Sequence, residues 1–438
     1  MSSPEFGQLM PALQWLMQEP DPLEEADVLT ESDDDYKVTR GKSKDRRCFE
    51  GQQKLDIDYF AEPSIYSEQD FKRRFRITKS LFMKIEGEIV EQDEYFLQKP
   101  DCTGLLGLST RQKITLALQL LAYGVASDST DEYARLADTT SRNTLRRFVK
   151  AIVEMYREEF LRKPTEVDLK RILHKNVKRG FPGCIGSLDC THWSWKNCPL
   201  GLSGQYKGKE KYPTVVLEAV ATKDTRIWHA FFGSPGSLNN LNILDQSPLF
   251  DDVIHKLGCQ VSFKIRDNTY DYGYYLEGAR KDIERAFGIL KGRFQILDRP
   301  GRFFYKSVME DVIICCIILH NMLIDERDVG FFPPPANLPY DIQVIPPIPD
   351  QPPLTSNEIN FQRMDVQSRL QHSYLIKDLV HVQWLRRGKL RRQRGDSNKN
   401  RDSDGASEGD GSASNDGGSE DGDSEGKDES AGDNMQLD

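Results

Sequence analysis

The 438-residue sequence lacks any run of 18 or more apolar residues, so no segment of it predicts a membrane span. Its longest apolar stretch, residues 312–319, has the length of a buried strand or of part of a core helix. Polar and acidic residues follow Met1, where a signal peptide would have basic and then apolar residues. We therefore expect an intracellular protein that contacts no membrane.

The eight cysteines also lack a zinc-binding pattern. Cys184, Cys190 and Cys198 cluster around His192, but their spacing matches no standard zinc motif, and no second CxxC pair follows. We expect reduced thiols buried beside a strand, with a zinc site as the alternative.

Charge is distributed unevenly along the chain. Residues 1–40 contain ten acids and two bases, and residues 395–438 contain fourteen acids and three bases. Since the whole chain has a net charge of −10, residues 41–394 carry a net charge of +9. The acidic composition predicts a disordered arm over residues 1–55 and a disordered tail over residues 395–438. The basic body between them suits a polyanionic partner.

Residues 56–180 have helical periodicity and predict a helical domain. Thr110 is the expected N-cap of one helix, and Gly124 its end. A short helix opening at Ser129 and a longer helix capped by Ser141 would form a helix-turn-helix. Basic residues at the start of the longer helix would then contact bases or phosphates: Arg142, Arg146 and Arg147. An ordinary helical hairpin explains the same pattern equally well.

Residues 181–330 predict an α+β domain, because β-branched and aromatic segments now precede the helices. Four strands are expected, at residues 185–188, 214–220, 227–232 and 261–265. The second and third strands flank a short turn and predict a hairpin. Two helices are expected to follow, at residues 280–294 and 306–325.

The last part of the chain begins with a proline-rich linker, residues 331–356, which excludes regular structure over residues 331–353. Residues 357–394 then predict a helix that ends in a basic run. The cations of this run are Arg386, Arg387, Lys389, Arg391, Arg392 and Arg394. Such a run is typical of a nuclear import signal or a nucleic-acid patch, and a solvated helix end is the alternative.

Several ordered motifs extend over about residues 55–385. They include GSLDCTHWSWKNCP at residues 186–199, IWHAFFG at 227–233, RKDIERAFG at 280–288 and LHNM at 319–322. In this order they resemble the plant-type branch of the PIF/Harbinger transposase-derived nuclease family. The resemblance implies an RNase H-like (DDE transposase) catalytic core, a helical N-terminal region, and an acidic triad that binds two divalent metal ions, magnesium or manganese.

Carried over by this resemblance, the metal-binding triad falls on Asp189, Asn240 and Glu284. Asn240 keeps a carbonyl oxygen but lacks the negative charge that a hard cation prefers. Asp245 lies five residues further on, at a different place on the loop or helix, so we do not expect it to substitute. The segment between Leu276 and Glu284 is also shorter than the family pattern, through a real deletion or a gene-model error.

Other residues near these motifs have two interpretations. We expect His192 to bond a neighbouring backbone group, in preference to phosphate or a metal-bound water. Core packing suits the tryptophans better than base stacking does: Trp193, Trp195 and Trp228. The lysines before the hairpin suit either DNA-backbone contact or a solvated turn: Lys207, Lys209 and Lys211.

The sequence therefore predicts a transposase-derived protein with impaired metal-dependent cleavage, retained as a DNA- or chromatin-associated protein. We expect it in the nucleus, with the cytoplasm as a second location. The resemblance also implies a separate Myb-like partner that supplies sequence-specific DNA binding. The alternatives are an active metal-dependent DNA endonuclease and a decaying transposon product without a selected role.

The +9 charge of residues 41–394 predicts DNA binding dominated by phosphate contacts. Raising NaCl from about 50 to about 200 mM should weaken binding by about tenfold or more, because each neutralised phosphate releases condensed counterions. Fluorescence anisotropy with a random-sequence duplex measures this dependence. An affinity that barely changes with salt would contradict a phosphate-driven interface.

Overall fold

The computed structural model describes eight parts of the chain, which are residues 48–100, 104, 106–125, 138–277, 281–327, 338–347, 354–366 and 368–403. For residues 389–403 only the backbone is described. The chain divides into two units, residues 1–383 and residues 384–438. The elements that carry the candidate site all belong to the first unit.

Helices make up the first part of the described chain. They are α3 (Cys48–Leu55), the π-helical turn η1 (Asp56–Phe60), α4 (Glu68–Phe75), α5 (Lys79–Gln92), the short 3-10 turn η2 (Glu94–Phe96), α6 (Thr110–Tyr123), α8 (Asp138–Phe160) and α9 (Glu166–Lys178). Side-chain caps explain where four of them begin, since Ser67, Thr78, Ser109 and Thr165 each accept a bond from the backbone N–H three residues on. α3 corrects the prediction of a disordered arm up to residue 55, because its eight residues are helical and bury Leu55.

The expected helix boundaries around the predicted helix-turn-helix are confirmed only in part. Gly124 does end α6, in the left-handed conformation with φ 56° that favours glycine. The N-cap of α6 is Ser109, because the Thr110 hydroxyl instead donates to a carbonyl of η2. Ser141 is not a cap, since α8 is already helical at residue 138 and Ser141 is fully buried inside it. The short helix expected at Ser129 lies outside the described residues.

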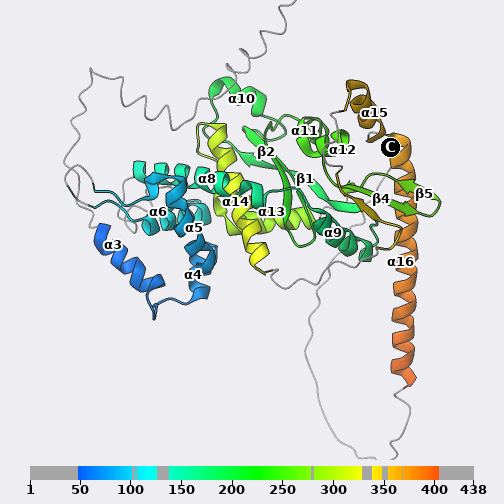
Figure 1. Ribbon diagram of the computed structural model, residues 1–438, viewed down its shortest axis with the longest axis horizontal. Coiled ribbons are helices and arrows are strands. Elements are labelled where there is room, and N and C mark those ends of the chain that lie inside the picture. Colours follow the sequence, from blue (N-terminus) through cyan, green and yellow to red (C-terminus); the bar gives the residue numbers. More distant parts are fainter. Residues whose placement is uncertain are drawn as a thin grey trace, which may run out of the picture. The chain divides into compact units, whose positions relative to one another are not determined.

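A four-stranded sheet carries the candidate site (Figure 1). Its strands are β1 (Cys184–Ser194), β2 (Thr214–Ala221), β3 (Ile227–Pro235) and β6 (Tyr274–Leu276), in the order β3-β2-β1-β6. The predicted hairpin of β2 and β3 is confirmed, and β1 pairs antiparallel with β2 and parallel with β6. The strand expected at residues 185–188 extends over eleven residues, because all of β1 from Ser187 onward pairs with β2.

A second, three-stranded sheet has the order β5-β4-β7. It contains β4 (Gln260–Ile265), β5 (Asn268–Tyr270) and β7 (Gln343–Ile345). β4 confirms the strand expected at residues 261–265. β7 corrects the exclusion of regular structure from the proline-rich segment, because three proline-free residues there pair antiparallel with β4 as an edge strand.

The remaining helices follow the strands or lie between them. They are α10 (Leu200–Tyr206), α11 (Asn240–Gln246), η3 (Pro248–Phe250), α12 (Asp251–His255), α13 (Lys281–Arg293), η4 (Gln295–Leu297), α14 (Lys306–Arg327), α15 (Ser356–Val366) and α16 (Arg369–Ser403). α13 and α14 confirm the two helices expected after the strands. α16 corrects the predicted start of the tail at residue 395, since its backbone stays helical to Ser403.

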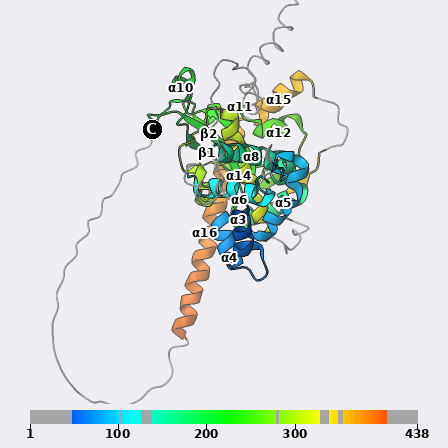
Figure 2. The same cartoon turned by 90° about the vertical axis from the view of Figure 1, so that its left-hand side faces the viewer.

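Helix α14 is the centre of the main hydrophobic core. Fifteen of its 22 residues are buried. It lies beside α8 (Figures 1 and 2) and also contacts β3. α14 is long and apolar enough to cross a membrane, but 83% of its most apolar window is buried inside the protein. The same core includes residues from Leu55 to Leu323, so the predicted domains 56–180 and 181–330 share one core.

Asn321, near the end of α14, ties three elements together. Its side-chain amide donates to the carbonyl oxygens of Phe160 at 2.8 Å and Ile227 at 2.7 Å. Its carbonyl oxygen accepts from the backbone N–H of Ile227 at 3.0 Å. The side chain is fully buried, so each of these bonds satisfies a group that no water could reach.

Replacing Asn321 with alanine should therefore destabilise the protein strongly. Three buried backbone groups of α8 and β3 would each lose a hydrogen bond, and the Phe160 carbonyl would keep a longer one from Arg226 at 3.4 Å. This predicts a loss of about 2–4 kcal/mol in the free energy of unfolding. Urea denaturation followed by circular dichroism measures this change. The exposed Asn360→Ala in α15 is the matched control and should shift stability by less than about 0.5 kcal/mol. Equal effects of the two substitutions would show that Asn321 is not an anchor.

Candidate metal centre and nucleic-acid surfaces

Asp189 lies in the middle of β1, opposite Ala219 of β2. Side chains alternate along a strand, so Asp189 shares its face of the sheet with Thr191 and Trp193. This is the face that packs on the main core, since Trp193 is buried there. Asp189 itself is half-buried, and one of its carboxylate oxygens accepts from the backbone N–H of Cys190 at 2.9 Å.

Glu284 lies in the first turn of α13 and is exposed. α13 covers the face of β1 that carries Asp189, because Lys291 donates to the Thr191 hydroxyl at 3.0 Å. Glu284 precedes Lys291 by seven residues, two helical turns, and so lies on the same side of α13. Two acids of the predicted triad thus lie on elements that face each other.

Asn240 begins α11 and is exposed, with Asn239 as the N-cap of the helix. The Ser247 hydroxyl, just beyond the end of α11, bonds to His229 of β3 at 3.1 Å. His229 neighbours Ala230, which pairs with Ala219, so His229 points to the face opposite Asp189. The helix that begins with Asn240 is therefore attached at its far end to the opposite face of the sheet.

The residues present do not fit a two-metal centre. Such a centre needs carboxylates that bridge or flank both ions, whereas this set offers two carboxylates and one neutral amide. Within the described part of the chain, no group of three or more His, Cys, Asp and Glu side chains is placed to hold a metal ion. The arrangement can present Asp189 and Glu284 to solvent cations, but it supplies no third anionic ligand from these positions.

A buried acid on the opposite face escaped the sequence analysis. Glu218 of β2 is 1% exposed, and its carboxylate oxygens have no hydrogen bond among the described residues. Burial raises the pKa of Glu218 to about 7, and only the nearby Ser247 hydroxyl opposes the shift. His229 lies 3.7 Å away, and burial followed by repulsion from Lys163 lowers its pKa to about 4. Glu218 is the one charged residue in an otherwise uncharged strand, and this pattern could have identified it as a buried acid from the sequence.

The arginines of the predicted recognition helix have different surroundings. Arg142 is exposed and Arg146 is half-buried. Arg147 pairs with Asp93 at 3.2 Å and lies 5.1 Å from the ring centroid of Tyr95, so it is engaged within the helical part. The DNA contacts expected of Arg142, Arg146 and Arg147 stay a prediction.

The lysines before the hairpin and the basic run lie on accessible elements. Lys207, Lys209 and Lys211 are all exposed. Arg386 and Arg387 are exposed in α16, and the backbone of the same helix includes the other four cations, Lys389, Arg391, Arg392 and Arg394. Their exposure is compatible with DNA contact and with nuclear import, and both roles stay predictions.

The aromatic and sulfur-containing residues follow the expectations with three corrections. Trp193 and Trp195 are buried, and each indole N–H donates to a backbone carbonyl, which confirms core packing. His192 was expected to bond a backbone group, but it bonds the Thr214 side chain at 2.9 Å. Thr214 lies within reach because it is the diagonal neighbour of His192 on β2, two residues from the residue that pairs with His192. Of the three clustered cysteines only Cys184 is fully buried; the other two are half-buried free thiols.

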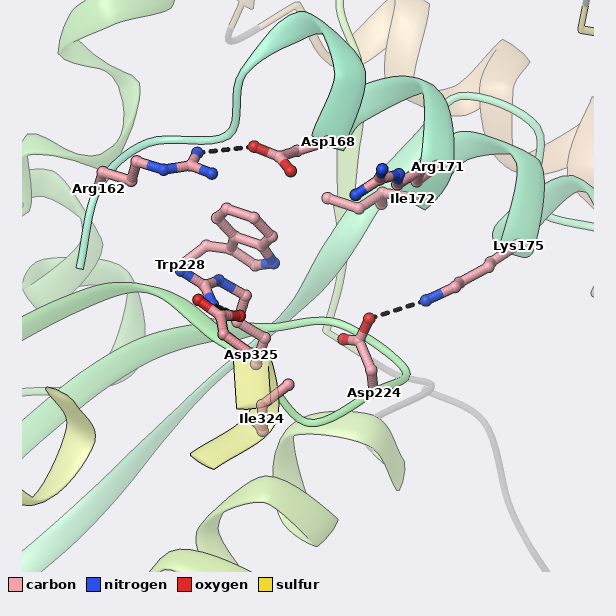
Figure 3. Close-up of a pocket in the computed structure, with 10 residues that line it drawn as sticks. Arg162, Asp168, Arg171, Ile172, Lys175, Asp224, Trp228, Ile324 and Asp325 are labelled. Atoms are coloured by element: carbon pink, nitrogen blue, oxygen red, sulfur yellow. Dashed lines mark hydrogen bonds and ion pairs between the residues drawn. The ribbon is translucent and has the colours of Figure 1, made fainter. Parts of the chain in front are cut away.

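Trp228 is the third correction, because it is half-buried and lines an open pocket of about 330 Å³ (Figure 3). The guanidinium groups of Arg162 and Arg226 lie 5.5 and 4.6 Å from its ring centroid. Four cations and three acids line the pocket, and three ion pairs join them: Arg162–Asp168, Lys175–Asp224 and Arg226–Asp325. The pocket therefore offers an aromatic ring among paired charges, with little net charge to attract phosphate.

Comparison with known proteins agrees with the motifs. A family described as plant transposon protein matches residues 158–278 and 276–330, and a domain of unknown function matches residues 51–90. The Arabidopsis thaliana protein named antagonist of like heterochromatin protein 1 is 25% identical over 312 residues, which cover 61% of this chain and 76% of that protein. An ALP1-like protein of the same plant is 24% identical over 309 residues, covering 62% and 75%. No solved structure matches.

These matches and the α+β fold agree with each other. They confirm the resemblance to the plant-type Harbinger transposase-derived family that the motifs predicted. The two segments of the family match meet at residues 276–278. The segment that the sequence predicts to be shortened lies at this junction, immediately before the helix that carries Glu284.

Glu218 makes stability depend on pH. Its folded pKa of about 7 lies above the ordinary 4.5, so the stability contributed by the protonated carboxyl is complete below pH 4.5 and is lost as pH rises to 7. The free energy of unfolding of Glu218→Gln, relative to that of wild type, should therefore rise by about 2 kcal/mol from about pH 5 to about pH 8. Urea denaturation at the two pH values measures this difference.

His229 titrates in the opposite sense, since its lowered pKa costs stability as pH falls below 6.5. The comparison of Glu218→Gln with wild type largely removes this contribution, because both proteins contain His229. The exposed Glu158→Gln is the matched control and should show no such pH-dependent gain. A gain of the same size in both variants would refute a specific role of Glu218.

Proposed function

We propose that this protein is a nuclear, DNA- or chromatin-associated member of its family in which metal-dependent DNA cleavage is impaired. Asn240 is the observation that carries the proposal, because it puts an amide where the family pattern has an acid. The junction in the family match at residues 276–278 supports it, since the missing segment leads directly into α13. In this proposal the protein retains an RNase H-like core as its scaffold. β1, β2 and β3 pair antiparallel, with parallel β6 beside β1, which supports such a core.

Impairment follows from the ligand chemistry of the proposed metal centre. Magnesium and manganese are hard cations that favour carboxylate oxygens, and an amide oxygen compensates none of their charge. Asp189 and Glu284 lie on facing elements, but the helix of Asn240 ends on the other face of the sheet. Two changes are therefore needed to rebuild the centre: a third anionic ligand and a correctly placed approach to Glu284.

Association with DNA or chromatin is supported by charge and by relationship. Residues 41–394 carry a net charge of +9, and exposed lysines precede the hairpin. One relative is named as an antagonist of a heterochromatin protein, which places that relative in a chromatin context. We propose the same context here, with nuclear import through the basic run at residues 386–394 and a Myb-like protein as the sequence-specific partner.

An active divalent-metal-dependent endonuclease is the second candidate function. It is favoured by one observation, that α13 lies over the face of β1 that carries Asp189. Under this candidate the remaining two carboxylates would support slow cleavage with manganese, which tolerates a poorer ligand set than magnesium does.

A nicking assay on supercoiled plasmid separates these candidates. With magnesium or manganese, wild type should nick no faster than Asp189→Ala, because the centre lacks one anionic ligand. Asn240→Asp should restore little activity, since the approach to Glu284 is also altered. Gel electrophoresis of relaxed and supercoiled DNA measures the rate.

Two outcomes would change the conclusion. Robust nicking by wild type that Asp189→Ala and Glu284→Ala abolish would overturn impairment and establish the endonuclease. Nicking by Asn240→Asp at a rate that the control Asn242→Asp does not reach would show that only one ligand is missing. Asn242 is an exposed residue of the same helix, so its variant adds the same charge nearby.

A further inference from the structure

A pocket outside the candidate site lies among α3, η1, α4 and the end of α6. It encloses about 540 Å³ within the region that matches a domain of unknown function. Four cations and two acids line it, namely Lys54, Arg73, Arg74, Arg76, Asp58 and Asp70. The excess of two positive charges favours an anionic occupant.

The pocket holds its cations in place through local contacts. Arg76 ends α4 in the left-handed conformation, with φ 62°, and its guanidinium lies 5.6 Å from the ring centroid of Tyr123. Arg73 shares its charge with Asp70 at 3.3 Å on the exposed surface, a contact that a stronger anion can replace at little cost. The cationic character of the pocket is therefore built into the fold and accessible from outside.

Exposed apolar side chains adjoin this pocket. Ile57 and Ile65 are 54% and 65% exposed, and the backbone N–H of Ile65 donates to the Ile57 carbonyl at 3.3 Å. Next to them Tyr66, 43% exposed, stacks on Tyr59 at a centroid distance of 5.0 Å. Isoleucine side chains make no favourable contact with a phosphate backbone. This surface therefore matches an acidic peptide with apolar residues better than it matches DNA.

We propose that residues 21–35 of the same chain dock on this surface. They contain eight acids and no base, and Leu23, Val28 and Leu29 are interspersed among the acids. The acids complement the four cations, and the apolar side chains complement Ile57 and Ile65. The proposed occupant of this surface is therefore a segment of the same protein, a role that goes beyond the proposed function.

The covalent connection makes this docking favourable. Twelve residues separate Asp35 from Cys48, the first residue of α3. A linker of this length spans at most about 40 Å when extended, which is several times the length of α3. Linkage raises the effective concentration of the segment to about the millimolar range, so individually weak ion pairs suffice.

Photocrosslinking in the full chain tests the proposal. Ile65→p-benzoylphenylalanine places the crosslinker on an exposed residue of the surface, so the fold is not disturbed. After irradiation, mass spectrometry should find crosslinks from position 65 to residues 21–35 of the same molecule. The same crosslinker at Leu257, which is 69% exposed in another part of the chain, should give no crosslink to that segment.

Charge variants in the crosslinking protein test the ionic part. Arg73→Gln with Arg74→Gln should lower the crosslink yield by about fivefold or more, because two ion pairs are lost. Lys196→Gln with Lys264→Gln removes the same charge from exposed positions elsewhere and should leave the yield unchanged. Circular dichroism melting curves verify that every variant is folded.

Four outcomes would overturn the proposal. They are a folded protein without crosslinks to residues 21–35, crosslinks only to residues 404–438, crosslinks only between isotopically distinct copies, and a yield that does not respond to Arg73 and Arg74. Crosslinking of position 65 to an added DNA duplex, in place of the segment, would likewise assign the surface to nucleic acid.

Discussion

The hydrogen bonds of Asn321 are the contact on which the rest of the structure depends. Through them α14 holds the end of α8 and the start of β3 at fixed positions, in a place that water does not reach. Neighbouring His320 is also buried and bonds the Thr225 carbonyl in the turn before β3 at 2.8 Å. The helical part and the sheet consequently form one core, and the candidate centre depends on both.

The same core explains why an impaired centre is compatible with an intact fold. Asp189 and Glu284 belong to β1 and α13, which are packed together by buried residues that have no metal-binding role, such as Trp193 and Ile283. Asn240 contributes only to the first turn of a short helix and is exposed. An uncharged residue at this position therefore leaves the packing of the core intact, so the proposed impairment of cleavage requires no loss of the fold.

Much of the fold followed from local patterns in the sequence. The β2–β3 hairpin and helices α13 and α14 have clear periodicity and turn residues, so their neighbours in sequence determine them. By contrast, the pairing of β7 with β4 and the engagement of Arg147 by Asp93 depend on residues far apart in the chain. The buried environment of Glu218 has the same origin, since β3 and the end of α11 create it. The triad positions were recognised by resemblance, and no local pattern could place them relative to one another.

The position of α14 in the chain has a consequence for biosynthesis. The ribosome delivers this helix only after the sheet and the helices up to η4 have been made, so the apolar faces of α8 and β3 have no partner until about residue 327 has emerged. Nascent chains that stop earlier expose those faces to chaperones and proteases. A chain that ends before α14 would therefore lack the centre of the main core.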